Sequence, residues 1–278
     1  VRARLAAADD ADAALYFFRL ALFHEDMHAE ALTYMRQTLD YPLHAPLAMA
    51  PIDLRASDVA AAGETFPIGS SRGEGFVFDN EKWAHPVEIA TGRIDRDCVS
   101  NGAFAEFVEA GGYRDPRWWS DQGRDWLRQA GCTGPSRWRE SARAGRGRWE
   151  QRWFGQWQPL PLDLPVCHVN AWEAEAYCRW RGRRLPLEAE WEHAASQGLI
   201  RWGGAVWEWM ADAFDPYPGF SPDPYRDYSA PWFGTHRCVR GGSFATDARL
   251  RHLRYRNFYL PNRSDVFVGF RTCGDTAG

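Results

Sequence analysis

Two histidines near the start of the chain, His24 and His28, have the spacing that a metal site requires. They lie in residues 11–39, a run without Pro or Gly that is rich in Ala, Leu, Met, Glu and Arg. That composition favours a helix. Residues four apart lie one above the other on the same helix face, so both imidazoles can bind one metal ion. The alternative is that the two histidines fall four apart and bind nothing.

The same run suggests how the helix is oriented. Apolar residues recur along it at roughly helical spacing: Leu15, Phe18, Leu22 and Met35. We therefore predict that this side of the helix is buried. Glu25 and Glu30 are close enough along the helix to hydrogen-bond an imidazole nitrogen and orient it. Residues 24–28 read HEDMH, which also matches the H-E-x-x-H pattern of zinc hydrolases, so that class is a further alternative.

Composition narrows the class of protein. A chain of 278 residues can bury a substantial core, as one large domain or two. Its net charge of −4 does not suggest a partner that is a nucleic acid or a membrane surface. No apolar run is long enough to span a bilayer and no signal peptide opens the chain, so we expect a cytoplasmic protein. Its 15 Trp and 16 Phe suit a fold with many long loops held by large side chains.

The six cysteines are scattered without a C-x-x-C pair, which argues against a zinc ribbon or a redox dithiol. In a cytoplasmic protein we expect buried thiols, although disulfide bonds remain open. The positions are Cys98, Cys132, Cys167, Cys178, Cys238 and Cys273.

The order of elements predicts an α+β fold in two domains, residues 1–50 and 51–278. Three prolines in residues 40–51 end the first helix and mark a linker. Residues 65–70 and 87–90 read as strands, and residues 101–110 as a short helix with Asn101 as its cap. Further helices are predicted at 170–180, capped by Asn170, and at 187–195, with loops and short strands after Gly203. Residues 118–157 permit no assignment.

Four strings in the second part are more specific than any propensity. Residues 184–192 read RLPLEAEWE, 206–209 read VWEW, 239–244 read VRGGSF and 269–271 read GFR. In this order they resemble the signatures of the formylglycine-generating-enzyme fold, which is related to C-type lectins. The resemblance implies a short-stranded core with long structured loops. That family carries a reactive cysteine pair after the RGGS string, but residues 244–256 contain no cysteine. We therefore do not expect copper-dependent oxidation of sulfatases.

An HxxxH helix joined to this fold resembles a narrower group, the non-haem iron sulfoxide synthases of ergothioneine and ovothiol biosynthesis and the related selenoneine synthases. Residues 78–81, 111–113 and 255–258 also resemble strings of that group. In that group a DinB-like helical bundle supplies three histidines. The resemblance implies that His24 and His28 bind Fe(II) and that the third ligand lies on an earlier helix, so that the N-terminal bundle is partly absent here. The resemblance outweighs the zinc-hydrolase interpretation, which remains a third option that the identity of the bound metal tests.

The resemblance implies small-molecule substrates, namely hercynine, O2 and a chalcogen donor. Asn257 would hydrogen-bond hercynine, and Phe258 would pack beside it. A tyrosine near the iron would act as a proton or hydrogen-bond donor, with Tyr225 as the first choice and Tyr228 as the second. Met27 stands where many relatives carry Gln, so the pocket is altered at that point.

The identity of the chalcogen donor is the most detailed prediction from the resemblance. Relatives that use γ-glutamylcysteine carry an acid where Tyr259 stands here, and that acid together with the equivalent of Arg263 holds the donor's amino-acid end. A selenosugar has no such end, so we expect a C–Se bond to the imidazole ring of hercynine. The alternatives are a C–S bond formed with cysteine or γ-glutamylcysteine, or a lectin-like binding module without catalysis. Iron content separates the enzyme from the module.

Overall fold

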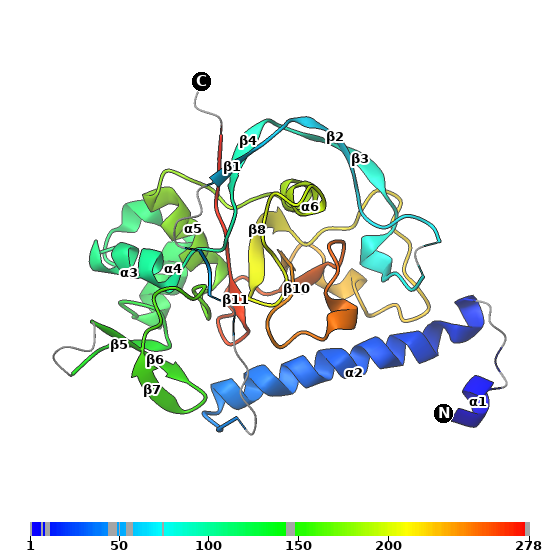
Figure 1. The fold of residues 1–278 in the computed structure, drawn as a ribbon, viewed down its shortest axis with the longest axis horizontal. Coiled ribbons are helices and arrows are strands. Elements are labelled where there is room, and N and C mark those ends of the chain that lie inside the picture. Colours follow the sequence, from blue (N-terminus) through cyan, green and yellow to red (C-terminus); the bar gives the residue numbers. More distant parts are fainter. Residues whose placement is uncertain are drawn as a thin grey trace.

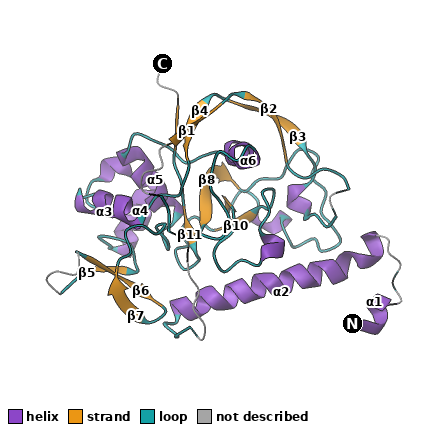
Figure 2. Ribbon diagram, in the orientation of Figure 1, coloured by secondary structure: helices purple, strands orange, loops and turns teal. Residues whose placement is uncertain are grey.

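The computed structural model describes residues 2–6, 8, 12–43, 49, 51–53, 58–73, 75–142 and 148–275. It is a mixed helix and strand structure in which the strands are short and loops make up much of the chain (Figure 2). No helix in this described part is long and apolar enough to cross a membrane. All six cysteines are free thiols; Cys132 is half-buried and the others are buried, as expected.

The predicted first helix is confirmed as α2, Asp12–Thr38, preceded by the short α1, Arg2–Ala6. It runs along one side of the molecule, beside the loops that surround β10 (Figure 1). In the described part of residues 1–57 the helices are α1 and α2 alone, so the expected DinB-like bundle is not seen. Residues 44–48, 50 and 54–57 of the predicted linker lie outside the described residues. The division at residue 50 therefore stays a prediction.

The predicted buried face of α2 was partly wrong. Leu22 and Met35 are exposed. Among the side chains of the helix that the structure describes, the buried ones besides Leu20 are polar: Asp26, Glu30 and Gln37. Because the rest of the protein offers hydrogen-bond donors and acceptors along this side, polar residues of α2 turn inward where an apolar stripe was expected.

The central sheet has four strands in the order β10-β9-β8-β11. β8 pairs antiparallel with β9, β9 with β10, and β11 runs parallel to β8. Val239 of β9 lies opposite Trp209 of β8 and Asn257 of β10, which fixes the register. The strands are β8 (Trp207–Ala213), β9 (Arg237–Arg240), β10 (Asn257–Tyr259) and β11 (Val268–Gly269).

Three smaller sheets and four helices surround this one. One sheet has the order β1-β4-β12, another pairs β2 with β3, and the third has the order β5-β6-β7. Their strands are β1 (Asp58–Ala61), β2 (Glu64–Ile68), β3 (His85–Ile89), β4 (Gly92–Asp95), β5 (Trp138–Glu140), β6 (Trp149–Trp153), β7 (Gln156–Pro159) and β12 (Cys273–Asp275). The helices are α3 (Asn101–Glu109), α4 (Asp121–Ala130), α5 (Ala171–Trp180) and α6 (Glu188–Ser196), with 3-10 turns η1 (Asp79–Glu81), η2 (Pro116–Trp118), η3 (Ala230–Trp232) and η4 (Ala248–Leu250).

The predicted strands and helices of the second part are confirmed, with one cap corrected. Asn170 caps α5, its side chain accepting a hydrogen bond from the Glu173 amide at 2.9 Å. For α3 the cap is Ser100, whose hydroxyl accepts from the Ala103 amide. The amide side chain of Asn101 instead donates to the carbonyl of Pro161, a contact from a distant segment.

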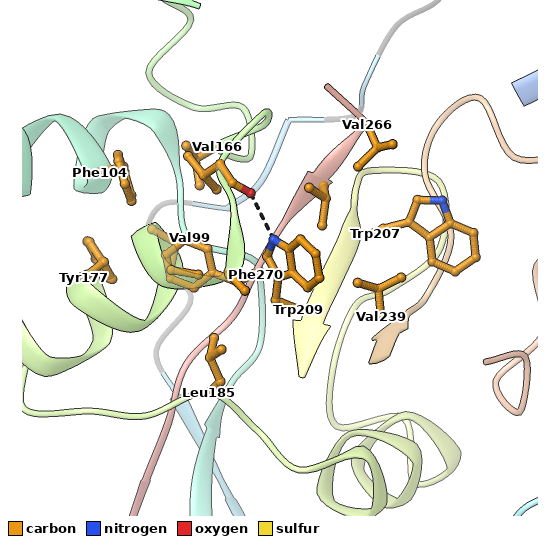
Figure 3. Close-up of a cluster of buried hydrophobic side chains, with 14 of the residues drawn as sticks. Val99, Phe104, Val166, Tyr177, Leu185, Trp207, Trp209, Val239, Val266 and Phe270 are labelled. Atoms are coloured by element: carbon orange, nitrogen blue, oxygen red, sulfur yellow. Dashed lines mark hydrogen bonds between the residues drawn. The ribbon is translucent and has the colours of Figure 1, made fainter. Parts of the chain in front are cut away.

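The core is built from aromatic side chains of the central sheet and of α3 and α5 (Figure 3). The Trp209 indole donates a hydrogen bond to the carbonyl of Val169, so this large buried ring leaves no polar group unpaired. Phe104 stacks on Tyr177 at 5.6 Å between ring centres, which fastens α3 to α5.

Fully buried ion pairs lie within this core. Arg271 binds Glu208 at 2.7 Å, and Arg256 binds Glu188 at 2.8 Å. Arg240 contacts Glu188 at 3.1 Å and also donates to Glu192. Burial alone would raise the pKa of Glu188, but Arg256 and Arg240 outweigh it and lower that pKa to about 2. The charged residues of these ion pairs belong to the four strings of the second part, RLPLEAEWE, VWEW, VRGGSF and GFR, and to the string at residues 255–258. The residues that make these strings recognisable therefore form, in large part, one buried network of ion pairs.

Candidate active site

His24 and His28 lie side by side on α2, as their spacing predicted. Their ring centres are 4.3 Å apart, and both side chains are exposed. Glu25 is the acid beside them, with a carboxylate oxygen 4.0 Å from Nδ1 of His28. The helix thus presents two imidazoles at one place, as a metal site needs.

A pocket of about 220 Å³ lies between α2 and the central sheet, and it contains both histidines. Its other walls come from segments far apart in the sequence: Met27, Glu30, Ala31 and Tyr34 of α2, then Trp207, Tyr228, Leu250, Tyr255, Asn257, Phe258 and Tyr259. The structure therefore brings together six of the eight residues selected from the sequence. Tyr225 and Arg263 do not line the pocket.

The structure places the two candidate tyrosines differently. Tyr225 is exposed and does not line the pocket. Tyr228 lines the pocket, and its ring stacks on Phe78 at 4.6 Å with an interplanar angle of 10°. Burial raises the pKa of both the Tyr228 and the Tyr255 phenols.

The loop that carries Tyr228 is held at both ends by Asp79. The Ser229 hydroxyl donates to one carboxylate oxygen, and the Asp223 amide donates to the other at 3.4 Å. Lys82 adds an ion pair to the Asp223 side chain at 2.7 Å. The string at residues 78–81 therefore positions Tyr228 through Phe78 and Asp79.

Asn257, Phe258 and Tyr259 reach the pocket from β10. The Asn257 amide nitrogen donates to the Tyr259 hydroxyl at 3.0 Å, and its oxygen accepts from the Phe258 amide at 2.8 Å. Phe258 stacks on Phe214 at 4.0 Å between ring centres. Asn257 thus arrives at the pocket with its orientation fixed by its own strand.

Arg263 is already paired within the chain. Its guanidinium donates to both carboxylate oxygens of Asp265, at 2.9 and 2.6 Å. It also lies over the rings of Tyr34 and Tyr259, 5.5 and 5.1 Å from their centres. Arg263 is therefore paired with Asp265 behind two rings that line the pocket and is not itself part of the lining.

Glu30 does not orient an imidazole. It accepts hydrogen bonds from the Trp207 indole at 2.8 Å, the Ser243 hydroxyl at 2.6 Å and the Thr246 hydroxyl at 2.8 Å. Burial raises the pKa of Glu30, while these three donors act in the opposite direction. The carboxylate therefore fastens α2 to the second part of the chain. Sequence reasoning missed this role because only the folded partners reveal it.

Several pocket residues besides Glu30 were not selected from the sequence. Tyr34, Trp207 and Tyr255 add aromatic surface to the walls, and Leu250 adds an apolar side chain. Trp207 lies in the VWEW string and Tyr255 in the string at residues 255–258, so both were within recognised strings. An aromatic wall of this kind recognises cations through the ring faces.

The donor set for a metal consists of the two imidazoles. Among the described residues no group of three His, Cys, Asp or Glu side chains could hold a metal ion. Neutral imidazoles suit Fe(II), Zn²⁺ and Cu²⁺, so the nitrogen donors fit Fe(II) without selecting it.

Comparison with known proteins places the chain in a family. Residues 55–202 and 196–276 match the model of the sulfatase-modifying factor enzyme 1-like domain. The chain belongs to this family. This confirms the resemblance carried by the four strings of the second part.

Individual relatives extend the comparison. The hercynine oxygenase of Mycobacterium tuberculosis is 34% identical over 328 residues, covering 97% of this chain and 75% of that protein. The formylglycine-generating enzyme of Streptomyces coelicolor is 28% identical over 285 residues, covering 78% and 88%. Among solved structures, Treponema denticola variable protein 1 overlaps with a TM-score of 0.49 at 17% identity, covering 78% of this chain and 94% of that one.

Proposed function

We propose that this protein is an oxygenase that acts on hercynine, with Fe(II) bound through His24 and His28. The observation that carries the proposal is the pocket in which these imidazoles meet Tyr228 and Asn257. The relation to a hercynine oxygenase along 97% of the chain supports the same substrate. When bound, Fe(II) would supply the redox chemistry with O2. A third ligand would come from outside the described residues.

The pocket suits the chemical groups of hercynine, a betaine with an imidazole ring, a trimethylammonium and a carboxylate. A quaternary ammonium is bound well by aromatic faces, which Trp207, Tyr255 and Phe258 offer here. Asn257 can hydrogen-bond the substrate, because its oxygen has acceptor capacity beyond the bond to Phe258. Tyr228 presents a phenol that stays protonated at neutral pH, since burial raises its pKa. It would serve as the proton or hydrogen-bond donor of the site.

For the second substrate we propose a selenosugar, which would give a C–Se bond on the hercynine ring. The support is the absence of a free charged partner for an amino-acid donor among the described pocket residues. Tyr259 stands at the position of the acid, and Arg263 is neutralised by Asp265. Burying an amino-acid end without ionic partners is costly. The alternative is a C–S bond formed with cysteine or γ-glutamylcysteine.

Iron binding is the first test of this function. Protein purified without oxygen and loaded with Fe(II) should consume O2 and hercynine, and His24→Ala or His28→Ala should abolish both bound iron and turnover. His85→Ala is the matched control, because His85 lies away from the pocket and contacts the carbonyl of Trp83. Full iron occupancy in both histidine variants would refute the site. A wild-type protein without iron or turnover would favour a lectin-like binding module.

The donor is tested by competition. Equal amounts of selenosugar, cysteine and γ-glutamylcysteine are offered with hercynine and O2, and the products are identified by mass spectrometry. We expect the selenium product to dominate. A dominant sulfoxide from either thiol would replace the C–Se proposal by C–S bond formation.

A further inference from the structure

Asp26 stands between His24 and His28 in the sequence of α2, two residues from each. Two residues correspond to about 200° of rotation in an α-helix, so Asp26 projects from nearly the opposite side to both imidazoles. Its side chain is 11% exposed, because this side of α2 packs against the second part of the chain. No step of the proposed reaction uses this carboxylate.

Arg249, in the η4 turn of the second part, binds Asp26 through two nitrogens. Its Nε donates to one carboxylate oxygen at 2.9 Å and its Nη2 donates to the other at 2.6 Å. Two parallel bonds between a guanidinium and a carboxylate fix the direction of the contact as well as its length. The backbone amide of Arg249 donates to the Asp247 side chain at 2.9 Å, which holds the turn from which the guanidinium projects.

The segment that carries Arg249 contacts α2 again one helical turn further on. There the Ser243 and Thr246 hydroxyls donate to Glu30, four residues after the first contact and therefore on the same side of the helix. Leu250, the residue after Arg249, lines the pocket of the candidate active site. One short segment thus joins α2 to a wall of that pocket.

The two contacts fix how far α2 is rotated about its own axis. Rings such as Phe23 and Phe76, with centres 5.1 Å apart, also pack along the helix, but hydrophobic contact has no preferred direction. Side chains extend about 5–6 Å from a helix axis, so a rotation of about 20° would move each imidazole by about 2 Å. Catalytic groups have to be held to within about 0.5 Å and about 10–20°. The bonds to Asp26 and Glu30 therefore control whether the imidazoles stay at the pocket.

We propose that Arg249 is a positioning residue for the candidate metal site. Its ion pair with Asp26 sets the rotation of α2, and so places His24 and His28 relative to the wall of the pocket that the second part supplies. Arg249 itself does not line this pocket. Its effect on turnover rests on the proposed function, whereas its effect on the place of the imidazoles does not.

The place of the imidazoles is measured without iron or substrate. Two imidazoles four residues apart on a helix bind Cu²⁺, so added Cu²⁺ marks their position. A nitroxide on Gln122→Cys, at an exposed position of α4, gives the Cu²⁺–nitroxide distance by double electron–electron resonance in a protein that also carries Cys132→Ser. We expect one narrow distance distribution in this parent protein and none after His24→Ala.

In Arg249→Ala the distribution should broaden or shift by about 2 Å, and Arg249→Lys, which keeps the charge without the fork, should restore part of it. Cu²⁺ affinity should stay unchanged, since both imidazoles lie on one helix. Arg201→Ala is the matched control, because Arg201 is also 51% exposed and also binds a largely buried carboxylate, Asp97, through two nitrogens. An unchanged distribution in Arg249→Ala overturns the proposal. So does a loss of Cu²⁺ binding, because the pair would then hold the helix together and not set its rotation.

Turnover gives the second test. In Fe(II)-loaded Arg249→Ala we expect kcat to fall at least about tenfold, since a misplacement of about 1 Å can cost about 100-fold. The KM for hercynine should stay unchanged, because the groups that would contact hercynine remain. Arg201→Ala should keep the parent kcat. A parent kcat in Arg249→Ala overturns the proposal, whereas a parent protein inactive on hercynine refutes only the proposed function, and the Cu²⁺ distance then decides on Arg249.

Discussion

Removing the Glu30 side chain should detach α2 from the second part of the chain. Three donors, from Trp207, Ser243 and Thr246, converge on this carboxylate, which is 5% exposed. Glu30→Ala leaves all three donors without their acceptor. Hydrogen bonds to a charged group contribute roughly 1.5–3 kcal/mol each, but burying the charge offsets part of that sum.

We therefore expect Glu30→Ala to lower the free energy of unfolding by about 3 to 5 kcal/mol. Glu30→Gln keeps an acceptor oxygen and removes the buried charge, so its effect should stay within about 1 kcal/mol. The raised pKa of Glu30 points the same way, because burial already disfavours the ionised form.

Urea unfolding followed by tryptophan fluorescence measures the effect, and hydrogen exchange of the α2 amides shows whether the helix opens. Glu25→Ala is the matched control on the same helix, because its side chain is 79% exposed. Equal losses of stability in Glu30→Ala and Glu25→Ala would refute the reasoning. So would an α2 that remains protected from exchange in Glu30→Ala.

Three further predictions concern the body of the fold. Burial raises the pKa of Glu173 from 4.5 to about 7, so the folded protein binds one more proton than the unfolded chain between these pH values. The free energy of unfolding should therefore fall by about 3 kcal/mol as pH rises through that window. Urea midpoints measured at about pH 5 and about pH 8 should show this fall in wild type and not in Glu173→Gln. Gly269→Ala places a methyl 2.2 Å from a backbone carbonyl and should cost at least about 3 kcal/mol in thermal or urea unfolding, with Gly134→Ala, which meets only an ordinary contact, as control. Asp79→Ala should free the loop that carries Tyr228 and cost about 1–3 kcal/mol, seen as faster limited proteolysis of residues 223–229 and a lower urea midpoint.

The first helix and the family could be predicted because each depends on local sequence. Residues 12–38 carry no helix breaker, and the four strings of the second part are contiguous. The Asn170 cap also follows from local chemistry, since the amide it accepts from is three residues away. In each case the determining contact is close in the chain.

What could not be predicted depends on distant partners. The buried side of α2 is set by partners more than 110 residues away, such as Trp207 for Glu30 and Phe154 for Gln37. Tyr228 lines the pocket and Tyr225 does not, in a loop that Asp79 contacts at residues 223 and 229. Nothing near residues 225–228 in the sequence distinguishes the two phenols. Residues 118–157 permitted no assignment, yet they contain α4, β5, β6 and the first two residues of β7.

The buried ion pairs constrain how this sequence can change over time. Replacing Arg271 or Glu208 alone leaves the other charge buried without its partner. This should lower the free energy of unfolding by about 3–5 kcal/mol, a large part of a typical domain's stability. Replacing both by apolar residues of similar volume can be neutral or even stabilising. The two end states are thus separated by an unstable single variant. For Glu188 the barrier is higher, because it serves both Arg240 and Arg256 and three positions would have to change together. Mutation one residue at a time would therefore rarely leave this network, even where a core without charges would fold as well.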